Sequence, residues 1–369
     1  MNEKYLIVRM QCSGLCNSLL ELEIALSISH ITNRILILPD INHCHGIIPS
    51  QRWESLWDVL DKDAIQQEFN VEFVLEENFR HAGDLKNYLI KNNINNFFYD
   101  ENPNINTVFY NRQSLTLSNF FEFTNFVNER CKFDTNRNEK YLIVDVWLDH
   151  FFHSVYAGNS KARNELKKKI NNALKYKSKY INIVDNLIKS KYKNYNAIHI
   201  RYPWFNRGDP NGSYQPDEID IRDRPNVLYK RVESLYRKDY PLYISTDLYE
   251  TSKAYGHDID PNEYLDPIRK NYNVITVDDL NLSFTETEKI AIDQTSCSLA
   301  NTFYGTYYST FSKRINIMRG INGRSVYDYM GWDKIQAPWM EIESPYPWKI
   351  LNKRWEWFYS SYLQYNFEN

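Results

Sequence analysis

Two basic side chains mark the end of a short apolar run in the second half of the chain. His199 and Arg201 stand two positions apart, directly before Tyr202-Pro203. Side chains with this spacing project to the same face of a strand, so both could contact one ligand. Because the pair stands at the end of a strand, directly before a break in the chain pattern, it predicts a ligand-binding position. A core histidine beside a surface arginine is the alternative, and the tripeptide alone does not exclude it.

Small and polar residues follow the first apolar run of the chain, among them Ser13, Gly14 and Asn17. At a turn between a strand and a helix, such residues let backbone amides approach a phosphate group. Neither the GxGxxG pattern of dinucleotide sites nor the GxxxxGK[ST] pattern of P-loops occurs, so these two classes of nucleotide site are excluded. An ordinary helix cap by Ser13 or Asn17 is the alternative.

The third segment whose residue types could do chemistry runs from Asp293 to Arg319. Gly305 allows a tight turn, and Ser309 and Thr310 then place hydroxyl groups and backbone amides at the start of a helix. Together they predict a cradle for phosphate. A plain serine cap is the alternative, but it leaves the residues before Gly305 unexplained.

Alternating elements must position these residues. Apolar runs at Tyr5–Val8 and Arg34–Pro39 flank Asn17–Ile31, which has helical spacing, and this predicts a βαβ unit with a parallel sheet. Tyr141–Trp147 is the last predicted strand of this half. The second half repeats the pattern, with strands predicted at Ala197–Ile200, Leu242–Ser245, Val274–Val277 and Asn301–Tyr304 and a helix at Ser309–Met318. Ligands of such sheets bind beyond the carboxyl ends of the strands, where the three segments lie.

The predicted fold class is therefore α/β, with two Rossmann-like domains facing each other across a cleft. We expect an N-terminal domain at 1–165, a lysine-rich helical connector at 166–193, a C-terminal domain at 194–335 that binds the ligand and a helical tail at 336–369 that packs back on the first domain.

Composition narrows the class of protein further. The chain of 369 residues is 43% hydrophobic and 25% charged, which is typical of a folded protein. The stretch from Lys161 to Lys193 holds eleven basic residues and two acidic ones. A solvated helix face explains this run better than a nucleic-acid surface, so we expect no nucleic-acid partner. No signal peptide or membrane span is evident, and five irregularly spaced cysteines do not suggest a disulfide framework, which favours a cytoplasmic location.

These segments, in this order, resemble the GDP-fucose-dependent protein O-fucosyltransferases and the related α1,6-fucosyltransferases. The matching residues are Gly14–Asn17 with Asn33-Arg34 and Pro39, then His199-Ile200-Arg201, and finally Asp293, Ala300, Phe303-Tyr304-Gly305 and Ser309-Thr310-Phe311. The resemblance implies a GT-B fold, with the acceptor on the side of the domain 1–165 and the nucleotide sugar bound by the domain 194–335. It also implies a metal-independent, inverting glycosyltransferase that uses GDP-fucose as donor substrate and a protein or oligosaccharide as acceptor, with no cofactor.

The resemblance also implies roles for single residues. Arg201 would be catalytic and neutralise the departing diphosphate. The donor-binding residues would be Gly14 and Asn17 near the phosphate or sugar, His199 at the nucleoside, Asp293 at guanine, and Ser309, Thr310 and Phe311 at phosphate and base. The chain departs from many relatives in having no acidic residue directly after Arg201; the first is Asp209. No residue stands out as the general base, for which Glu21, Asp145 and Asp209 are candidates.

Two alternatives stay open at this point. A metal-dependent transferase would bind a divalent ion through a DxD motif, and Asp61-Lys62-Asp63 and Asp258-Ile259-Asp260 both have those letters. A catalytically inactive carbohydrate-binding protein of the same fold is the other alternative. The presence of both Arg201 and Asp293 speaks against it.

Overall fold

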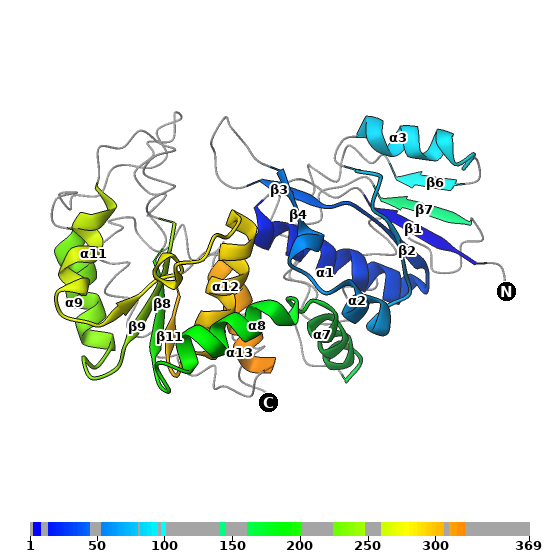
Figure 1. Cartoon of the computed structure of the whole chain (residues 1–369). Coiled ribbons are helices and arrows are strands. Elements are labelled where there is room, and N and C mark those ends of the chain that lie inside the picture. The colour runs from blue at the N-terminus through cyan, green and yellow to red at the C-terminus, as the bar shows by residue number, and fades with distance from the viewer. Residues whose placement is uncertain are drawn as a thin grey trace, which may run out of the picture. The chain divides into compact units, whose positions relative to one another are not determined.

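The computed structural model describes residues 3–8, 14–44, 53–79, 82–94, 97–100, 140–144, 161–200, 224–247, 260–305 and 310–321. The chain divides between Tyr176 and Lys177 into two compact units. Each unit contains one parallel sheet with helices on its faces, which Figure 1 shows unit by unit.

Unit 1 is built around a five-stranded parallel sheet in the order β5-β2-β1-β7-β6. Its strands are β1 (Tyr5–Val8), β2 (Ile35–Pro39), β5 (Val71–Val74), β6 (Phe97–Asp100) and β7 (Tyr141–Val144). Its helices are α1 (Leu15–Thr32), α2 (Lys62–Glu68), α3 (Ala82–Lys91) and α7 (Lys161–Ala173), with a short 3-10 helix at Leu56–Asp58 and a hairpin of β3 (Asn42–Cys44) and β4 (Trp53–Ser55).

The inner strands β1 and β2 of unit 1 are buried on both faces, as expected for a parallel sheet. Ile7, Ile37 and Ile143 pack with Leu85 and Leu89 of α3 in one hydrophobic cluster. Helix α1 lies on the other side of the sheet (Figure 1) and is buried almost all round. Its interior hydroxyls are satisfied locally, since Ser27 and Thr32 each donate to the carbonyl four residues earlier. Most of this helix therefore serves the core.

Asn33 and Arg34, which resemble a family motif, have a structural role here. Asn33 ends α1 in the left-handed conformation, with φ 50° and ψ 47°, and its N–H reaches the carbonyls of Ser29 and His30. The buried Arg34 side chain donates to the carbonyls of Tyr5 and Lys140, which precede or begin two neighbouring strands. The pair thus fixes the amino ends of β1, β2 and β7.

Unit 2 contains a four-stranded parallel sheet in the order β10-β9-β8-β11. Its strands are β8 (Asn196–Ile200), β9 (Leu242–Thr246), β10 (Val274–Ile275) and β11 (Phe303–Tyr304). Its helices are α8 (Ser178–Val184), which continues as a π-helix at Asp185–Lys189, then α9 (Arg224–Leu235), α11 (Pro261–Arg269), a 3-10 helix at Asp278–Leu280, α12 (Glu286–Leu299) and α13 (Thr310–Ile321).

The two faces of this second sheet differ in chemistry. Ile198, Ile200, Leu242 and Ile244 point into an apolar cluster with α9 and α11. The alternate residues of β8 and β9 therefore face the other side, where α12 packs against both strands. Figure 1 shows α9 and α11 on one side of β8 and β9 and α12 and α13 on the other. The second side carries polar residues of the predicted site.

The predicted α/β class is confirmed, since each of the two units has its own parallel sheet with helices on both faces. β7, the last predicted strand of its half, is also the last described strand of unit 1 along the chain, and in the sheet it lies between β1 and β6. The division at residue 176 falls within the expected connector 166–193, because α7 packs on α2 in unit 1 and α8 packs on α12 in unit 2. The expected tail at 336–369 lies outside the described residues.

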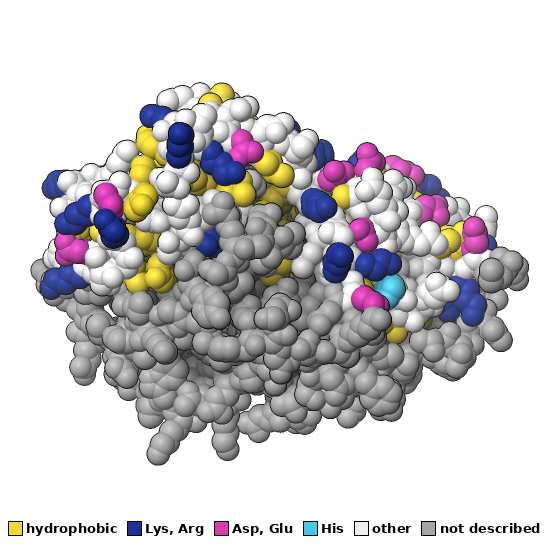
Figure 2. Space-filling model, turned by 90° about the horizontal axis from the view of Figure 1, so that it is seen from below, with side chains coloured by type: hydrophobic (Ala, Val, Ile, Leu, Met, Phe, Trp, Pro, Cys, Tyr) yellow, Lys and Arg dark blue, Asp and Glu magenta, His cyan; other side chains and the backbone are white. Residues whose placement is uncertain are grey.

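The lysine-rich stretch forms ordinary helix surface. Leu166, Ile170 and Leu174 are buried, while Lys179 pairs with Glu288 and Lys189 with Asp185. On the face shown in Figure 2, Lys and Arg side chains of the described part alternate with Asp and Glu. Across the ranges that the structure describes, no helix has the length and apolar character needed to cross a bilayer.

Candidate functional site

The strand order of unit 2 places the site. β8 is the first strand of the unit, the next two lie on one side of it, and β11 lies on the other. Between β8 and β11 the order reverses, and open α/β sheets bind ligands at the carboxyl ends of the strands at such a reversal. Arg201 follows β8 directly, and Gly305 follows β11 directly. The topology thus brings together the ends of two segments that lie a hundred residues apart in the sequence.

His199 is held in place by helix α13. Its side chain is 6% exposed and faces away from the apolar cluster of α9 and α11. Nδ1 of His199 and Oγ of Ser312 share a hydrogen bond of 2.7 Å. The imidazole also stacks on the ring of Phe311, with 4.4 Å between ring centroids and 27° between planes. Two side chains of the first turn of α13 therefore fix both the position and the plane of the histidine ring.

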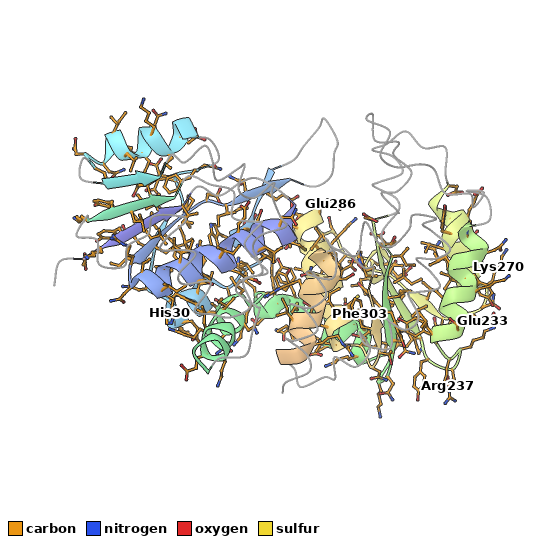
Figure 3. All side chains as sticks on the ribbon, turned by 180° about the vertical axis from the view of Figure 1, so that it is seen from behind. His30, Glu233, Arg237, Lys270, Glu286 and Phe303 are labelled. Atoms are coloured by element: carbon orange, nitrogen blue, oxygen red, sulfur yellow. The ribbon has the colours of Figure 1, made fainter. Side chains whose placement is uncertain are left out.

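Gly305 makes this close approach of α13 possible. A Cβ atom at residue 305 would lie 2.6 Å from both Cβ and Oγ of Ser312 and 3.1 Å from the ring of Phe303. Phe303 is labelled in Figure 3, on β11 beside α12 and α13. The sequence suggested that glycine serves a tight turn here. The structure gives a different reason, because the missing side chain leaves room for the helix that carries Ser312.

Asp293 lies on α12 and is bound to the neighbouring strand. Its Oδ1 accepts a hydrogen bond of 2.6 Å from the Tyr243 hydroxyl, and its Oδ2 accepts one of 2.8 Å from the Ser245 hydroxyl. Burial raises the pKa of Asp293 from 3.8 to about 7, although both hydroxyls act in the opposite direction. Burial also raises the pKa of Tyr243 well above its ordinary value, so this phenol stays protonated and able to donate.

Strand register joins the histidine and the aspartate into one layer. Ser245 is the direct neighbour of His199 across β8 and β9, and both side chains lie on the α12 side of the sheet. Ser245 in turn binds Asp293. Of the predicted site residues, His199, Asp293 and Phe311 are therefore gathered between the sheet, α12 and α13.

Helices α12 and α13 are themselves locked together near this layer. Nε2 of Gln294 donates to the carbonyl of Phe311 at 3.4 Å. The guanidinium of Arg319, which is 2% exposed, donates to carbonyls at the end of α12, with distances of 2.8 Å to Ala300 and 3.1 Å to Asn301. A cation at a helix C-terminus is favoured by the helix dipole. The first turn of α12, with Glu286 labelled in Figure 3, closes with a capping box between Thr285 and Glu288.

Gly14 and Asn17 lie in unit 1 at the start of α1. Gly14 is the N-cap, with φ −59° and ψ 152°, and has no side chain with which to cap the helix. An ordinary cap by Asn17 is therefore wrong, and Asn17 is half-buried in the first turn. Ser13, the other capping candidate, lies outside the described residues. A Cβ atom on Gly14 would meet nothing within 4 Å. Within the described residues, packing thus gives no reason for a glycine here. Unit 1 also reverses its strand order beside β1, between β1 and β7.

One carboxylate of each DxD motif, that of Asp61 and that of Asp260, caps a helix. Asp61 caps α2 and accepts from the N–H groups of Asp63 and Ala64. Asp260 caps α11 and accepts from the N–H of Asn262. In the described ranges, no group of three His, Cys, Asp or Glu side chains is placed to hold a metal ion. The charged pair of Glu233 with Lys238 lies on the α9 side of the sheet, where Figure 3 labels Glu233.

Several predicted residues fall outside the described part of the chain. These are Arg201, Ser309, the side chain of Thr310, and the general-base candidates Asp145 and Asp209. The third candidate, Glu21, is 1% exposed within α1. Sequence reasoning missed Tyr243, Ser245 and Ser312. Alternation offered a signal for the first two, since hydroxyl-bearing residues recur at every second position of an apolar strand.

Comparisons with known proteins give consistent matches. The family model described as GDP-fucose protein O-fucosyltransferase matches residues 5–322. POFUT1 solved with GDP-fucose has a TM-score of 0.49 and 11% identity, and the match covers 86% of this chain and 94% of that one. The fucosyltransferase NodZ from Bradyrhizobium has a TM-score of 0.47 and 15% identity, covering 86% and 93%. A comparison with curated protein sequences finds no match.

Proposed function

Since this chain belongs to the GDP-fucose protein O-fucosyltransferase family, we propose that it transfers fucose from GDP-fucose to a hydroxyl group of a protein or glycan. The reaction would invert the anomeric carbon and need no metal ion. The enzyme class expected from the sequence, a glycosyltransferase, is confirmed by the family. The donor sugar, the stereochemistry and the acceptor belong to the proposal.

One observation carries the donor assignment most directly. The strand order reverses between β8 and β11, and along the sequence Arg201 follows β8 directly while the segment that leads to α13 follows β11. A basic side chain would then meet a helix N-terminus, where backbone N–H groups and the helix dipole attract anions. This supports a diphosphate site formed by Arg201, Ser309 and Thr310.

The reaction requires stabilisation of the negative charge that develops as GDP departs. The glycosidic C–O bond to the diphosphate breaks through an oxocarbenium-like transition state, and negative charge grows on the departing oxygen. Arg201 would neutralise that charge with two parallel N–H donors. In a water-poor site, loss of one such donor costs about 2.7–4 kcal/mol of activation free energy. The residue would thus contribute mainly to turnover.

The nucleoside would lie against the polar layer between the sheet and α13. The ring stack of His199 and Phe311 offers an aromatic surface whose plane is fixed by Ser312. Asp293 would accept from N1–H and N2–H of guanine, two donors that uracil and adenine do not present together. Each carboxylate oxygen has one described hydroxyl donor, which leaves a further lone-pair direction on each.

Unit 1 would take part through the start of α1. Within the described residues, a Cβ atom on Gly14 would meet nothing within 4 Å, so Gly14 would leave room for a phosphate or sugar to approach. Asn17 would add an amide to the same ligand. Of the general-base candidates, Glu21 is the least suited, because a side chain buried within α1 cannot reach an acceptor proton.

We propose metal independence because the chain has its own groups that could balance the negative charge of the diphosphate. Arg201 and the start of α13 can balance a diphosphate, and Asp61 and Asp260 already serve as helix caps. A cytoplasmic location, inferred from the cysteine pattern, is part of the proposal.

Arg201 variants test the function. Purified wild type, Arg201→Lys and Arg201→Ala would be incubated with GDP-fucose, and released GDP would be measured with and without candidate acceptors. Both variants should lose turnover strongly, with a smaller loss of GDP affinity, because a lysine cannot form the paired contact. Near-normal turnover in a stably folded Arg201→Ala protein would sink the proposal. A wild type that binds GDP but never releases it from GDP-fucose would favour the inactive binding protein.

A further inference from the structure

Two hydroxyl groups of one strand hold the carboxylate that the proposed function assigns to guanine. Tyr243 and Ser245 are two residues apart on β9, so both side chains face α12. One binds Oδ1 of Asp293 and the other binds Oδ2. All three side chains are buried, with exposed fractions of 0% for Tyr243, 2% for Ser245 and 9% for Asp293.

We propose that Tyr243 and Ser245 are positioning residues that set the nucleobase selectivity of the donor site by clamping the Asp293 carboxylate from the β9 side. The inference rests on the proposed function, and it names residues outside the family motifs. A carboxyl group turns freely about its last bond when nothing holds it. With each oxygen tied to a different hydroxyl, the carboxylate plane is fixed relative to β9.

The clamp leaves a matched pair of acceptors for a ligand. An ionised carboxylate has about four lone-pair directions, and the two hydroxyls occupy one on each oxygen. The remaining directions lie on neighbouring oxygens, and guanine presents N1–H and N2–H as neighbouring donors. Uracil offers one donor between two acceptors at that edge, and adenine offers one donor beside an acceptor. Selectivity therefore depends on both oxygens keeping their orientation.

The charge state of Asp293 provides an independent readout. Burial brings its pKa to about 7, and the hydroxyl bonds of Tyr243 and Ser245 oppose that rise. The other groups that act on the carboxylate are Asp278, which raises its pKa, and Lys289, which lowers it. Since only the ionised form accepts from both guanine donors, GDP affinity should rise as the pH increases towards about 7 and then level off. Removing a clamping hydroxyl should move this rise to higher pH.

Binding calorimetry on the full chain tests the clamp. GDP, UDP and ADP would be titrated into wild type, Tyr243→Phe and Ser245→Ala across a range of pH. Each variant should bind GDP about tenfold more weakly at neutral pH, as expected for a lost hydrogen bond to a charged group, with UDP and ADP unchanged. Tyr195→Phe is the matched control. Its hydroxyl is also buried and binds α12, but through the carbonyl of Ser296 at 2.7 Å.

The outcomes separate this inference from the proposed function. A wild type that binds GDP, UDP and ADP equally contradicts the proposed function itself. A wild type that prefers GDP, with Tyr243→Phe and Ser245→Ala keeping both that preference and the wild-type pH profile, overturns only the clamp. A shifted pH profile in these two variants, with none in Tyr195→Phe, supports it. Equal shifts in all three variants would show that loosening α12 is sufficient, and would overturn it as well.

Discussion

Gly305 is the position where one added methyl group should disturb the candidate donor site most directly. In Gly305→Ala the new Cβ would lie 2.6 Å from Cβ of Ser312, whereas ordinary contact begins near 3.4 Å, so α13 must move by about 0.8 Å. Overpacking of this kind costs about 1–3 kcal/mol. For a unit of this size, that corresponds to a fall in melting temperature of roughly 2–12 °C.

The same displacement of α13 should also weaken the hydrogen bond that holds His199 in the candidate donor site. Ser312 holds His199 at 2.7 Å, and a displacement of that size takes the pair towards the limit of a hydrogen bond. We therefore expect GDP affinity to fall about tenfold, the factor that corresponds to about 1.4 kcal/mol.

Thermal unfolding and GDP calorimetry on one preparation would measure both effects. Gly14→Ala is the control for stability, since its Cβ would meet nothing within 4 Å, and its cost as a changed helix cap should stay within about 1 kcal/mol. Adding Ser312→Gly to Gly305→Ala removes the clashing atoms. The fall in melting temperature of the double variant should therefore be smaller than the sum of the falls of the two single variants. If Gly305→Ala melts like wild type and binds GDP normally, the close approach of α13 to residue 305 is refuted.

Three further outcomes are expected. Asp293 has a folded-state pKa of about 7 against 3.8 in its ordinary state, so its contribution to stability is present at low pH and lost as the pH rises through this window. Across this window the free energy of unfolding should fall by up to about 1.4 kcal/mol per pH unit. Urea unfolding of Asp293→Asn should show no such fall, and a fall equal to that of wild type refutes the assignment. Arg319→Met strands buried carbonyls at the end of α12 and should cost about 3 kcal/mol or more in unfolding free energy. Arg237→Met, at a side chain that is 81% exposed, should stay within about 0.5 kcal/mol, and similar values for the two would contradict the capping role. Release of GDP from GDP-fucose should persist in EDTA, and a rate that collapses in chelator and returns with Mn²⁺ would move the chain to a metal-dependent mechanism.

Short apolar runs and helical spacing predicted several elements. Tyr5–Val8 has the predicted bounds, Ala197–Ile200 was placed to within one residue, and the helix at Ser309–Met318 was placed to within three. The strand at Val71–Val74 was missed, because Glu72 interrupts its apolar run at the edge of the sheet. The interior place of β7 was also not predictable, since strand order depends on how crossovers pack and not on local pattern.

The site was predicted in part, for a related reason. Spacing pointed to His199 and the family resemblance pointed to Asp293, and the strand register shows why they lie near each other, through Ser245. The partners of these residues come from segments distant in sequence. Ser312 is 113 residues from His199, and Tyr243 is 50 residues from Asp293. Only the packed sheet and helices reveal such pairs. The family match, over residues 5–322, also extends well beyond the three segments that carried the resemblance.

A nucleotide panel measured by thermal unfolding tests the central claim most directly. GDP, GDP-fucose, UDP, UDP-glucose and ADP would each be added to the wild-type chain at several concentrations. A ligand at 100 times its Kd stabilises the folded state by about 2.7 kcal/mol, a shift that is readily detected. The account predicts that GDP and GDP-fucose raise the melting temperature and that the uridine and adenine nucleotides leave it unchanged. A shift with UDP-glucose equal to or larger than that with GDP-fucose would contradict it.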